Sequence, residues 1–173
     1  AYPPSLKAGR PVETKINPTI ADGIAVAKPG KVPFDIIKDY VDRVVTVTED
    51  EIAKAMLGVM EKSKMVVEAG GAVGVAALAA KKLKLKGTTA VILSGGNIDP
   101  LLLQRVIRHG LAASDRYTNI AVMLPDRPGQ LVRTAQAVAS AHANVVEVLH
   151  TRHNNGLEIS EVELDLSVET RGK

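Results

Sequence analysis

The chain has 173 residues, of which 46% are hydrophobic, and a formal net charge of +3 at pH 7. That length accommodates one or two small domains, and with one Phe and no Trp their core must be aliphatic. The absence of Cys excludes disulfides and Cys-based zinc sites and is compatible with a cytoplasmic protein. We expect no membrane segment and no signal peptide, because no apolar run reaches about 18 residues and the first residues lack a charged-then-apolar pattern.

The first 30 residues are rich in turn formers. Residues 1–18 contain four Pro and one Gly, which predicts irregular extended chain. The segment TIADG at residues 19–23 predicts a turn, and Pro-Gly at 29–30 predicts another. On the residues alone, Asp22 and Gly23 are ordinary turn formers.

Residues 31–87 alternate between helical and strand patterns. Apolar spacing predicts a short helix over 34–41, and the β-branched run at 44–47 predicts a strand. Thr48 and Glu51 form a capping-box pattern that opens a longer helix. The sequence EAGG at 68–71 interrupts that helix, and a second helix of small residues is expected over 72–83. This alternation is typical of the α/β class.

The sequence KKLKLK at residues 81–86 concentrates positive charge at the end of this second helix. Cations complement the negative end of a helix dipole, so a solvated helix terminus accounts for the cluster. No aromatic residue is interleaved with these lysines to stack on bases. We therefore expect no nucleic-acid partner.

The stretch from residue 88 to 101, TTAVILSGGNIDPL, predicts a buried strand, a Gly-rich turn and a helix opened by Asp99 and Pro100. Such turns lie where open α/β sheets bind ligands, and Ser94 adds a hydroxyl to the free N–H groups of Gly95, Gly96 and Asn97. Two interpretations stay open for the turn itself. It is either an ordinary tight connection or a ligand site such as an anion cradle.

Three separately placed motifs carry a family resemblance: TIADG at 19–23, the pattern E-x-x-GA-x-G-x-AAL at 68–78, and SGGN at 94–97. Together they resemble the threonine/serine ammonia-lyases (threonine dehydratases), fold type II enzymes that use pyridoxal 5'-phosphate. The resemblance covers about residues 1–110. It implies that residues 1–113 are the C-terminal portion of a catalytic domain with an open twisted sheet and helices on both faces.

The resemblance also implies roles for individual residues. Ser94 would face the nitrogen of the cofactor ring, and the cofactor-binding set would be Ser94, Gly95, Gly96, Asn97, Gly23 and Asp22. Glu68 would place a carboxylate beside the ring, although a charge at a helix N-terminus explains it equally. The family's usual Pro after this Glu is replaced by Ala69.

The reaction implied is β-elimination of L-threonine, and of L-serine, to a 2-oxo acid and ammonia, in isoleucine biosynthesis or in threonine breakdown. The family's Ser-Phe-Lys segment, with the lysine that holds the cofactor, and its phosphate-binding loop do not occur in these 173 residues. We therefore expect this chain alone to be inactive.

Residues 114–173 show a second pattern. Strands are predicted at 119–124, 144–150 and 159–168, with a helix from Leu131 after the first and a hairpin turn at 154–156. Apolar and polar residues alternate along the third segment, so one face of it should be buried.

Strand, P-x-R-P-G-x-L turn, helix and hairpin resemble an ACT domain, the ferredoxin-like (βαββαβ) regulatory module that many of these enzymes carry. The last helix and strand of that module would be missing after Lys173, and the family's strand order 4-1-3-2 would leave residues 119–124 at a sheet edge. An amino-acid effector would then bind allosterically, with its carboxylate at the helix N-terminus. The effector-binding residues implied are Asp126, Pro128, Gly129, Gln130, Leu131 and Asn144. We also expect a homo-oligomer.

Three other interpretations concern parts of the pattern. His142, His150 and His153 lie close in sequence, but no acidic or thiol ligand completes a set, so we expect no metal site. A stand-alone amino-acid-binding module without catalytic activity is the alternative to an enzyme fragment. An unrelated nucleotide-binding protein would rest on SGGN alone, without GxGxxG or GxxxxGK[ST].

Overall fold

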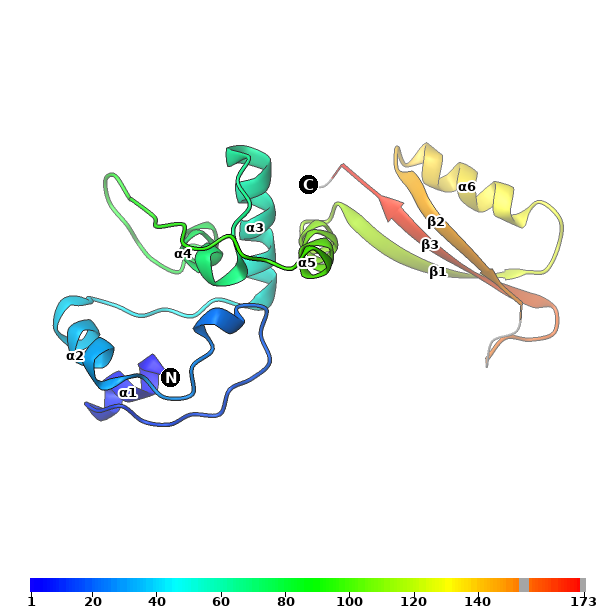
Figure 1. The fold of residues 1–173 in the computed structure, drawn as a ribbon. Coiled ribbons are helices and arrows are strands. Elements are labelled where there is room, and N and C mark those ends of the chain that lie inside the picture. Colours follow the sequence, from blue (N-terminus) through cyan, green and yellow to red (C-terminus); the bar gives the residue numbers. More distant parts are fainter. Residues whose placement is uncertain (153–155, 172–173) are drawn as a thin grey trace. The chain divides into compact units, whose positions relative to one another are not determined.

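The computed structural model describes residues 1–152 and 156–171 (Figure 1). The chain divides into two compact units, Ala1–Ile107 and Arg108–Lys173, each with a hydrophobic core of its own. The elements in chain order are α1 (Tyr2–Ala8), the 3-10 helix η1 (Asp22–Ile24), α2 (Lys31–Tyr40), α3 (Glu49–Ser63), α4 (Ala69–Ala79), α5 (Pro100–Ala113), β1 (Tyr117–Pro125), α6 (Gln130–Ser140), β2 (Asn144–Thr151) and β3 (Glu161–Glu169).

Helices α3 and α4 form the centre of the first unit. The predicted capping box opens α3: Thr48 Oγ1 accepts from the Glu51 N–H at 3.3 Å, and Glu51 Oε2 accepts from the Thr48 N–H at 2.8 Å. The apolar face of α3 packs against Ala72 and Ala76 of α4, both fully buried. Because α4 presents methyl groups and glycines there, its backbone lies close to its neighbours.

Two boundary predictions in this unit were wrong. Residues 1–18 are not uniformly irregular, because α1 forms with its prolines in the first turn, where a missing N–H leaves no hydrogen bond unmade. The second helix begins at Ala69 rather than 72, with Glu68 as its N-cap. The break between α3 and α4 instead follows Lys64, which ends α3 in the left-handed conformation.

The strands predicted at 44–47 and 88–94 were also wrong: both segments are irregular, and the first unit contains no sheet ladder among its residues. β-branched composition favours a strand only where a neighbouring strand completes the hydrogen bonds. Both segments instead line a hollow of about 530 Å³ beside α4. The expected open sheet with helices on both faces is therefore not what residues 1–107 form here.

The second unit is built on an antiparallel sheet with strand order β1-β3-β2. The β1–β3 register runs from Tyr117↔Glu169 to Pro125↔Glu161. The three predicted strands and the helix are confirmed, except that β3 begins at Glu161 and leaves Ile159 exposed outside it. The predicted alternation is confirmed as well, with Val162, Leu164, Leu166 and Val168 buried.

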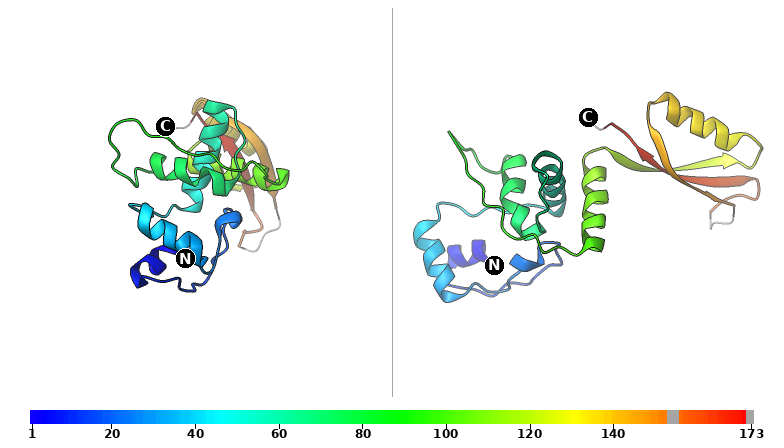
Figure 2. Two further views of the ribbon diagram at one scale, coloured as in Figure 1. Left: turned by 60° about the vertical axis from the view of Figure 1, so that its left-hand side comes forward. Right: turned by 45° about the horizontal axis from the view of Figure 1, so that its top comes forward.

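Helix α6 lies along one face of this sheet, beside β2, in all views (Figures 1 and 2). The predicted hairpin turn involves Asn154 and Asn155, which lie outside the described residues. Across residues 1–152 and 156–171, none of the helices has both the length and the apolar character that a membrane span requires.

Candidate functional site

Glu68 connects the start of α4 to the Gly-rich turn. Its N–H donates to the Gly95 carbonyl oxygen at 3.2 Å. Its half-buried carboxylate lies directly over the Cα of Gly95, so a Cβ there would overlap the carboxylate carbon and both of its oxygens. Gly95 also has φ +75, a conformation that other residues rarely adopt. Only glycine therefore fits at this position.

The turn touches α4 at a second point, one residue earlier. A Cβ on Gly71 would collide with the Ser94 carbonyl group, and it would lie 2.8 Å from a methyl group of Val67. The missing side chain of Gly71 thus lets the loop backbone rest on the first turn of the helix. Residues 94–95 are fixed against α4 by these two glycine contacts and the Glu68–Gly95 hydrogen bond.

The TIADG segment reaches the same region through an anchor that the sequence analysis missed. Glu49 accepts hydrogen bonds from the Thr19 hydroxyl at 2.6 Å and from the Ile20 N–H at 2.9 Å. The Thr19 hydroxyl in turn accepts from the Ala21 N–H at 3.1 Å. The available signal was the acidic run Glu49-Asp50-Glu51, of which the capping box uses only the last residue.

This anchor places η1 next to Glu68. A Cβ at Gly23 would lie 3.9 Å from Glu68 Oε1, and a Cβ at Gly70 would lie equally close. Four of the residues singled out from the sequence, Asp22, Gly23, Glu68 and Asn97, line one cavity of about 660 Å³. Its remaining wall includes Asp99, which caps α5 by accepting from the N–H groups of Leu101 at 2.8 Å and Leu102 at 3.0 Å.

Ser94 does not line that cavity. It is exposed, and it lines the neighbouring hollow of about 530 Å³ together with residues of α4 and the segments 45–47 and 89–92. Gly70 lines both spaces. The structure therefore places Ser94 and Glu68 on two sides of the same glycine-rich turn of α4, rather than in one pocket.

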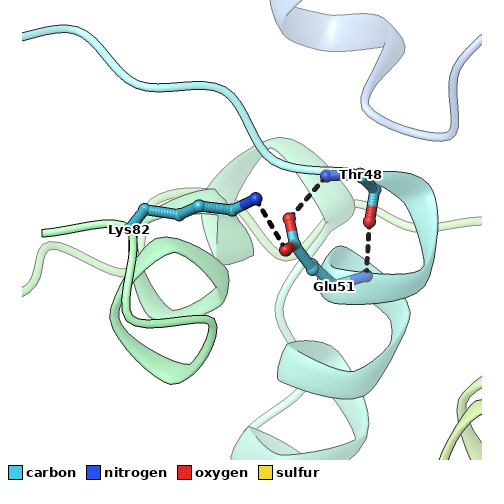
Figure 3. Close-up of polar contacts among 3 residues, drawn as sticks. All are labelled: Thr48, Glu51 and Lys82. Carbon is cyan, nitrogen blue, oxygen red and sulfur yellow. Dashed lines mark hydrogen bonds and ion pairs between the residues drawn. The ribbon is translucent and has the colours of Figure 1, made fainter.

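An ion pair holds the chain after α4 against the start of α3. Lys82 Nζ lies 2.8 Å from Glu51 Oε1, and the same carboxylate accepts from the Thr48 N–H (Figure 3). The Lys82 ammonium and the Thr48 N–H lower the pKa of Glu51 below its ordinary value. Lys82, which the sequence suggested was merely solvated, thus fixes the first residues of the long segment that leads to Ser94.

The second unit has a cavity of about 300 Å³ at the start of α6. It is lined by five of the six residues implied as effector-binding, namely Asp126, Pro128, Gly129, Gln130 and Leu131, together with Arg127, His150 and Arg152. Arg152 and Asp126 form a two-pronged ion pair in its wall, with Nε–Oδ2 at 3.0 Å and Nη2–Oδ1 at 3.4 Å.

Asn144, the sixth implied effector residue, does not lie at this cavity. It pairs with Glu169, whereas the β1 end of the cavity is level with Glu161 on the same strand. Eight residues of strand separate the two positions, roughly 26 Å. His142 likewise belongs to the α6–β2 connection, and His153 lies outside the described residues. Among the residues that are described, no three His, Cys, Asp or Glu side chains form a metal-binding group.

Comparison with known proteins assigns the first unit. Residues 1–95 match the family described as "Pyridoxal-phosphate dependent enzyme". The chain belongs to this pyridoxal-phosphate-dependent family. The two motifs TIADG and E-x-x-GA-x-G-x-AAL and the first two residues of SGGN lie inside the matched range.

Two curated relatives extend the likeness over nearly the whole chain. An "L-threonine ammonia-lyase" of Geobacter sulfurreducens is 44% identical over 169 residues, covering 97% of this chain and 42% of its own length. One of Thermotoga maritima is 44% identical over 167 residues, covering 96% and 41%. The chain thus spans about two fifths of the length of these relatives.

Solved structures give the same assignment for part of the chain. A threonine deaminase of the organism abbreviated T.th. is 35% identical with a TM-score of 0.54, over 57% of this chain and 35% of that one. A processed threonine deaminase isoform of Solanum lycopersicum is 33% identical with a TM-score of 0.55, over 62% and 32%. In both likenesses this chain corresponds to about a third of the other molecule.

The residues of this family member fit one side of pyridoxal phosphate. The cofactor needs a partner for the ring nitrogen, space for a flat ring, a cradle for its phosphate and a lysine. An exposed Ser94 hydroxyl beside a cavity walled by apolar residues and glycines meets the first two needs. The only Phe, Phe34, lies between Pro33 and Asp35, so no Ser-Phe-Lys lysine is present to meet the last.

Proposed function

We propose that this chain is part of an L-threonine ammonia-lyase: the C-terminal portion of its catalytic domain, residues 1–113, and an incomplete ACT domain, residues 114–173. The observation that carries the proposal is 44% identity to two proteins of that name over almost the entire chain. The contact of Glu68 with Gly95 beside Ser94 supports it, because those residues come from two different motifs of the family.

In this proposal Ser94 donates or accepts a hydrogen bond at the cofactor's ring nitrogen, and Gly95 and Gly96 let the backbone approach the ring. When bound, pyridoxal phosphate supplies an electron-withdrawing ring that favours loss of a β-hydroxyl. A neutral hydroxyl at the ring nitrogen does not hold a proton there as a carboxylate would. That suits elimination, where the hydroxyl leaves quickly and a long-lived carbanion invites side reactions.

Glu68, Asp22, Gly23 and Asn97 form the other wall in this proposal. Glu68 places its carboxylate over Gly95 and keeps the turn in a single conformation. Asp22 and Asn97 border the same cavity and offer polar groups to an amino-acid substrate. Because Glu49 fixes the segment carrying Asp22 and Gly23, it acts on the site through that segment.

The test is a chimera in which this chain replaces the matching segment of the Geobacter enzyme. We expect the chimera to bind pyridoxal phosphate and to release 2-oxobutanoate and ammonia from L-threonine. Ser94→Ala should keep cofactor binding but lower the rate by roughly tenfold to a hundredfold, because one hydrogen bond in a desolvated site contributes about 1–3 kcal/mol. A folded, cofactor-loaded chimera without activity toward threonine or serine would contradict the proposal.

The 173-residue chain by itself should be inactive. We expect pyridoxal phosphate and borohydride to label its exposed lysines at random rather than one lysine stoichiometrically, since no Ser-Phe-Lys segment is present. Mass spectrometry of the reduced mixture measures this. A single stoichiometric adduct would show that the chain has a complete cofactor site of its own.

We also propose that the 300 Å³ cavity at the start of α6 binds an amino-acid effector that regulates the enzyme. The free N–H groups after Gly129 and the neighbouring Arg127 and Arg152 favour a carboxylate there. Titration with amino acids should shift the NMR signals of Gly129, Gln130 and Leu131 and leave Asn144 unchanged. If Asn144 alone responds, the effector binds at the opposite end of the sheet.

A stand-alone amino-acid-binding module is the second candidate, and the same cavity favours it. The two candidates differ in one outcome. Effector binding to the chain that changes nothing in the chimera's rate supports the module, whereas a changed rate supports regulation of the enzyme.

A further inference from the structure

The three-stranded sheet of the second unit has two edges, β1 and β2, because both strands pair with the central β3. An unprotected edge offers a row of backbone N–H and C=O groups to another strand. The two edges differ in how well they are protected, and this difference identifies where a partner binds.

The outward groups of β1 follow from its hydrogen bonds to β3. Just beyond the two ends of the strand pair, the Thr170 N–H donates to Arg116 O and the Asp126 N–H donates to Ser160 O. In an antiparallel pair, hydrogen-bonded positions alternate, so the even-numbered residues of β1 bond inward to β3. The backbone groups of Asn119, Ala121 and Met123 therefore point away from the sheet.

This edge has none of the usual protective features. Its sequence, YTNIAVMLP, carries no charge and has Pro only at its last position. Its pairing with β3 is regular over nine residues, without a bulge. Ala121 is exposed, and Met123 is 66% exposed. A straight, apolar, uncharged edge of this kind favours pairing with another strand.

The β2 edge is better protected. Its pairing with β3 is irregular between Val145 and Glu147, which places a bend in the edge. It also carries the charged Glu147 and the polar His150 among its eight residues. Charge and irregularity are the features by which natural sheets avoid edge pairing. A second molecule is thus directed to β1.

An apolar groove continues from β1 toward α6. The even-numbered residues of β1, among them Ile120, Val122 and Leu124, face the helix and line a cavity of about 770 Å³ with Val138 and Leu166. Ile120 remains 40% exposed there. The groove is open along the side where β1 has no neighbouring strand among the described residues.

We propose that β1 pairs antiparallel with β1 of a second copy of this chain, with Ala121 opposite Ala121. This register pairs all nine residues and places Asn119 opposite Met123 of the other copy. The two-fold axis stands perpendicular to the sheet, so the even-numbered residues of both strands share one face. The two grooves then join between the two α6 helices, and a six-stranded sheet forms with the protected β2 strands outside. Because both open edges are used, association stops at a dimer.

The test uses the full 173-residue chain in sedimentation at several concentrations. Wild type should approach twice 18.3 kDa as its concentration rises. Ala121→Pro should stay monomeric yet folded, because Pro at this position removes an outward N–H and no bond to β3. Ala121→Thr, which keeps the N–H, should dimerise like wild type. A wild type that stays monomeric, or an Ala121→Pro dimer of unchanged strength, would overturn the proposal.

Charge-swap variants test the register and do not depend on tolerance of Pro. Ala121→Lys and Ala121→Glu each place like charges opposite one another and should be monomeric, whereas their equimolar mixture should form a heterodimer. Ala139→Lys, at an exposed position on α6 that does not line the groove, is the matched control and should dimerise. If the mixture stays monomeric while Ala139→Lys dimerises, this register is wrong and the proposal fails.

Discussion

The two units use β-branched sequence in opposite ways. In residues 108–173, three β-rich segments meet one another and form a sheet whose central strand is buried on the α6 side. In residues 1–107, the β-rich segments 44–47 and 88–94 find no pairing partner and stay irregular beside α4. Strand propensity is similar in the two regions. The difference is whether a partner strand is available within the chain, since backbone hydrogen bonds need two strands.

Order in the first unit comes instead from side chains that hold backbone. Glu49 fixes residues 19–20, Glu68 covers Gly95, and Lys82 pairs with Glu51. In the second unit a ladder fixes the backbone, and side chains fill the space under α6. Mutations should therefore act through packing in the second unit and through single anchors in the first.

The largest expected effect is that of Leu166→Ala in the centre of β3. Leu166 is 2% exposed, and truncating a buried Leu typically costs about 2–5 kcal/mol of folding free energy. That is most of the stability of a domain of this size. Hydrogen exchange should rise throughout β1, β2 and β3.

The matched control for this variant is Leu57→Ala in the buried face of α3. It should raise exchange in α3 and α4 while the sheet keeps its protection. Equal loss of protection in both units from either variant would mean that they share one folding unit, contrary to the two separate cores.

Gly71→Ala should be next in size. Its Cβ would collide with the Ser94 carbonyl group, so the loop or the helix must move, at a cost of about 1–3 kcal/mol. Gly58→Ala in α3 is the control, because nothing lies within 4 Å of its Cβ position. There the substitution should stabilise the helix by about 0.5–1 kcal/mol. Denaturant titration of both variants measures the contrast, and effects of the same sign would contradict the close approach at Gly71.

The sequence predicted some of these features and missed others for identifiable reasons. The Thr48–Glu51 capping box and the alternation in β3 are local patterns, and both are confirmed. The strands at 44–47 and 88–94 were wrong because pairing depends on residues distant in sequence. The association of Glu68 with Gly95 joins residues 27 positions apart in the sequence, and spacing alone does not reveal it.

Glu49→Ala should have a smaller effect, on the order of 1 kcal/mol, because its two hydrogen bonds are exposed to solvent. The expected result is faster exchange at the N–H groups of residues 20–24, with α3 itself protected. Asp39→Ala, a change of the same kind on the exposed side of α2, should leave that segment unaffected. Unchanged exchange at residues 20–24 in Glu49→Ala would show that another contact holds η1.

The smallest effect should come from pH acting on Glu51. Lys82 and Thr48 lower the pKa of its carboxyl in the folded chain, so ionised Glu51 favours folding. This contribution is complete above the ordinary pKa of a glutamate and is lost as the pH falls through the lowered folded value. Glu51→Gln should therefore be less stable than wild type near neutral pH and approach it in acid, in thermal melts at several pH values. A gap that widens in acid would mean that the sign is wrong.

Helix α4 buries methyl groups and glycines where most core helices bury long side chains. Alanine has no rotamers to lose on folding and none to rearrange when a neighbour shifts. Ala72 and Ala76 therefore transmit a displacement of α3 directly to the α4 backbone, and the contacts of Gly71 and Glu68 pass it on to Ser94 and Gly95. Helix and turn thus behave as one stiff lever, and the position of the Ser94 hydroxyl is set by the seating of α4 on α3.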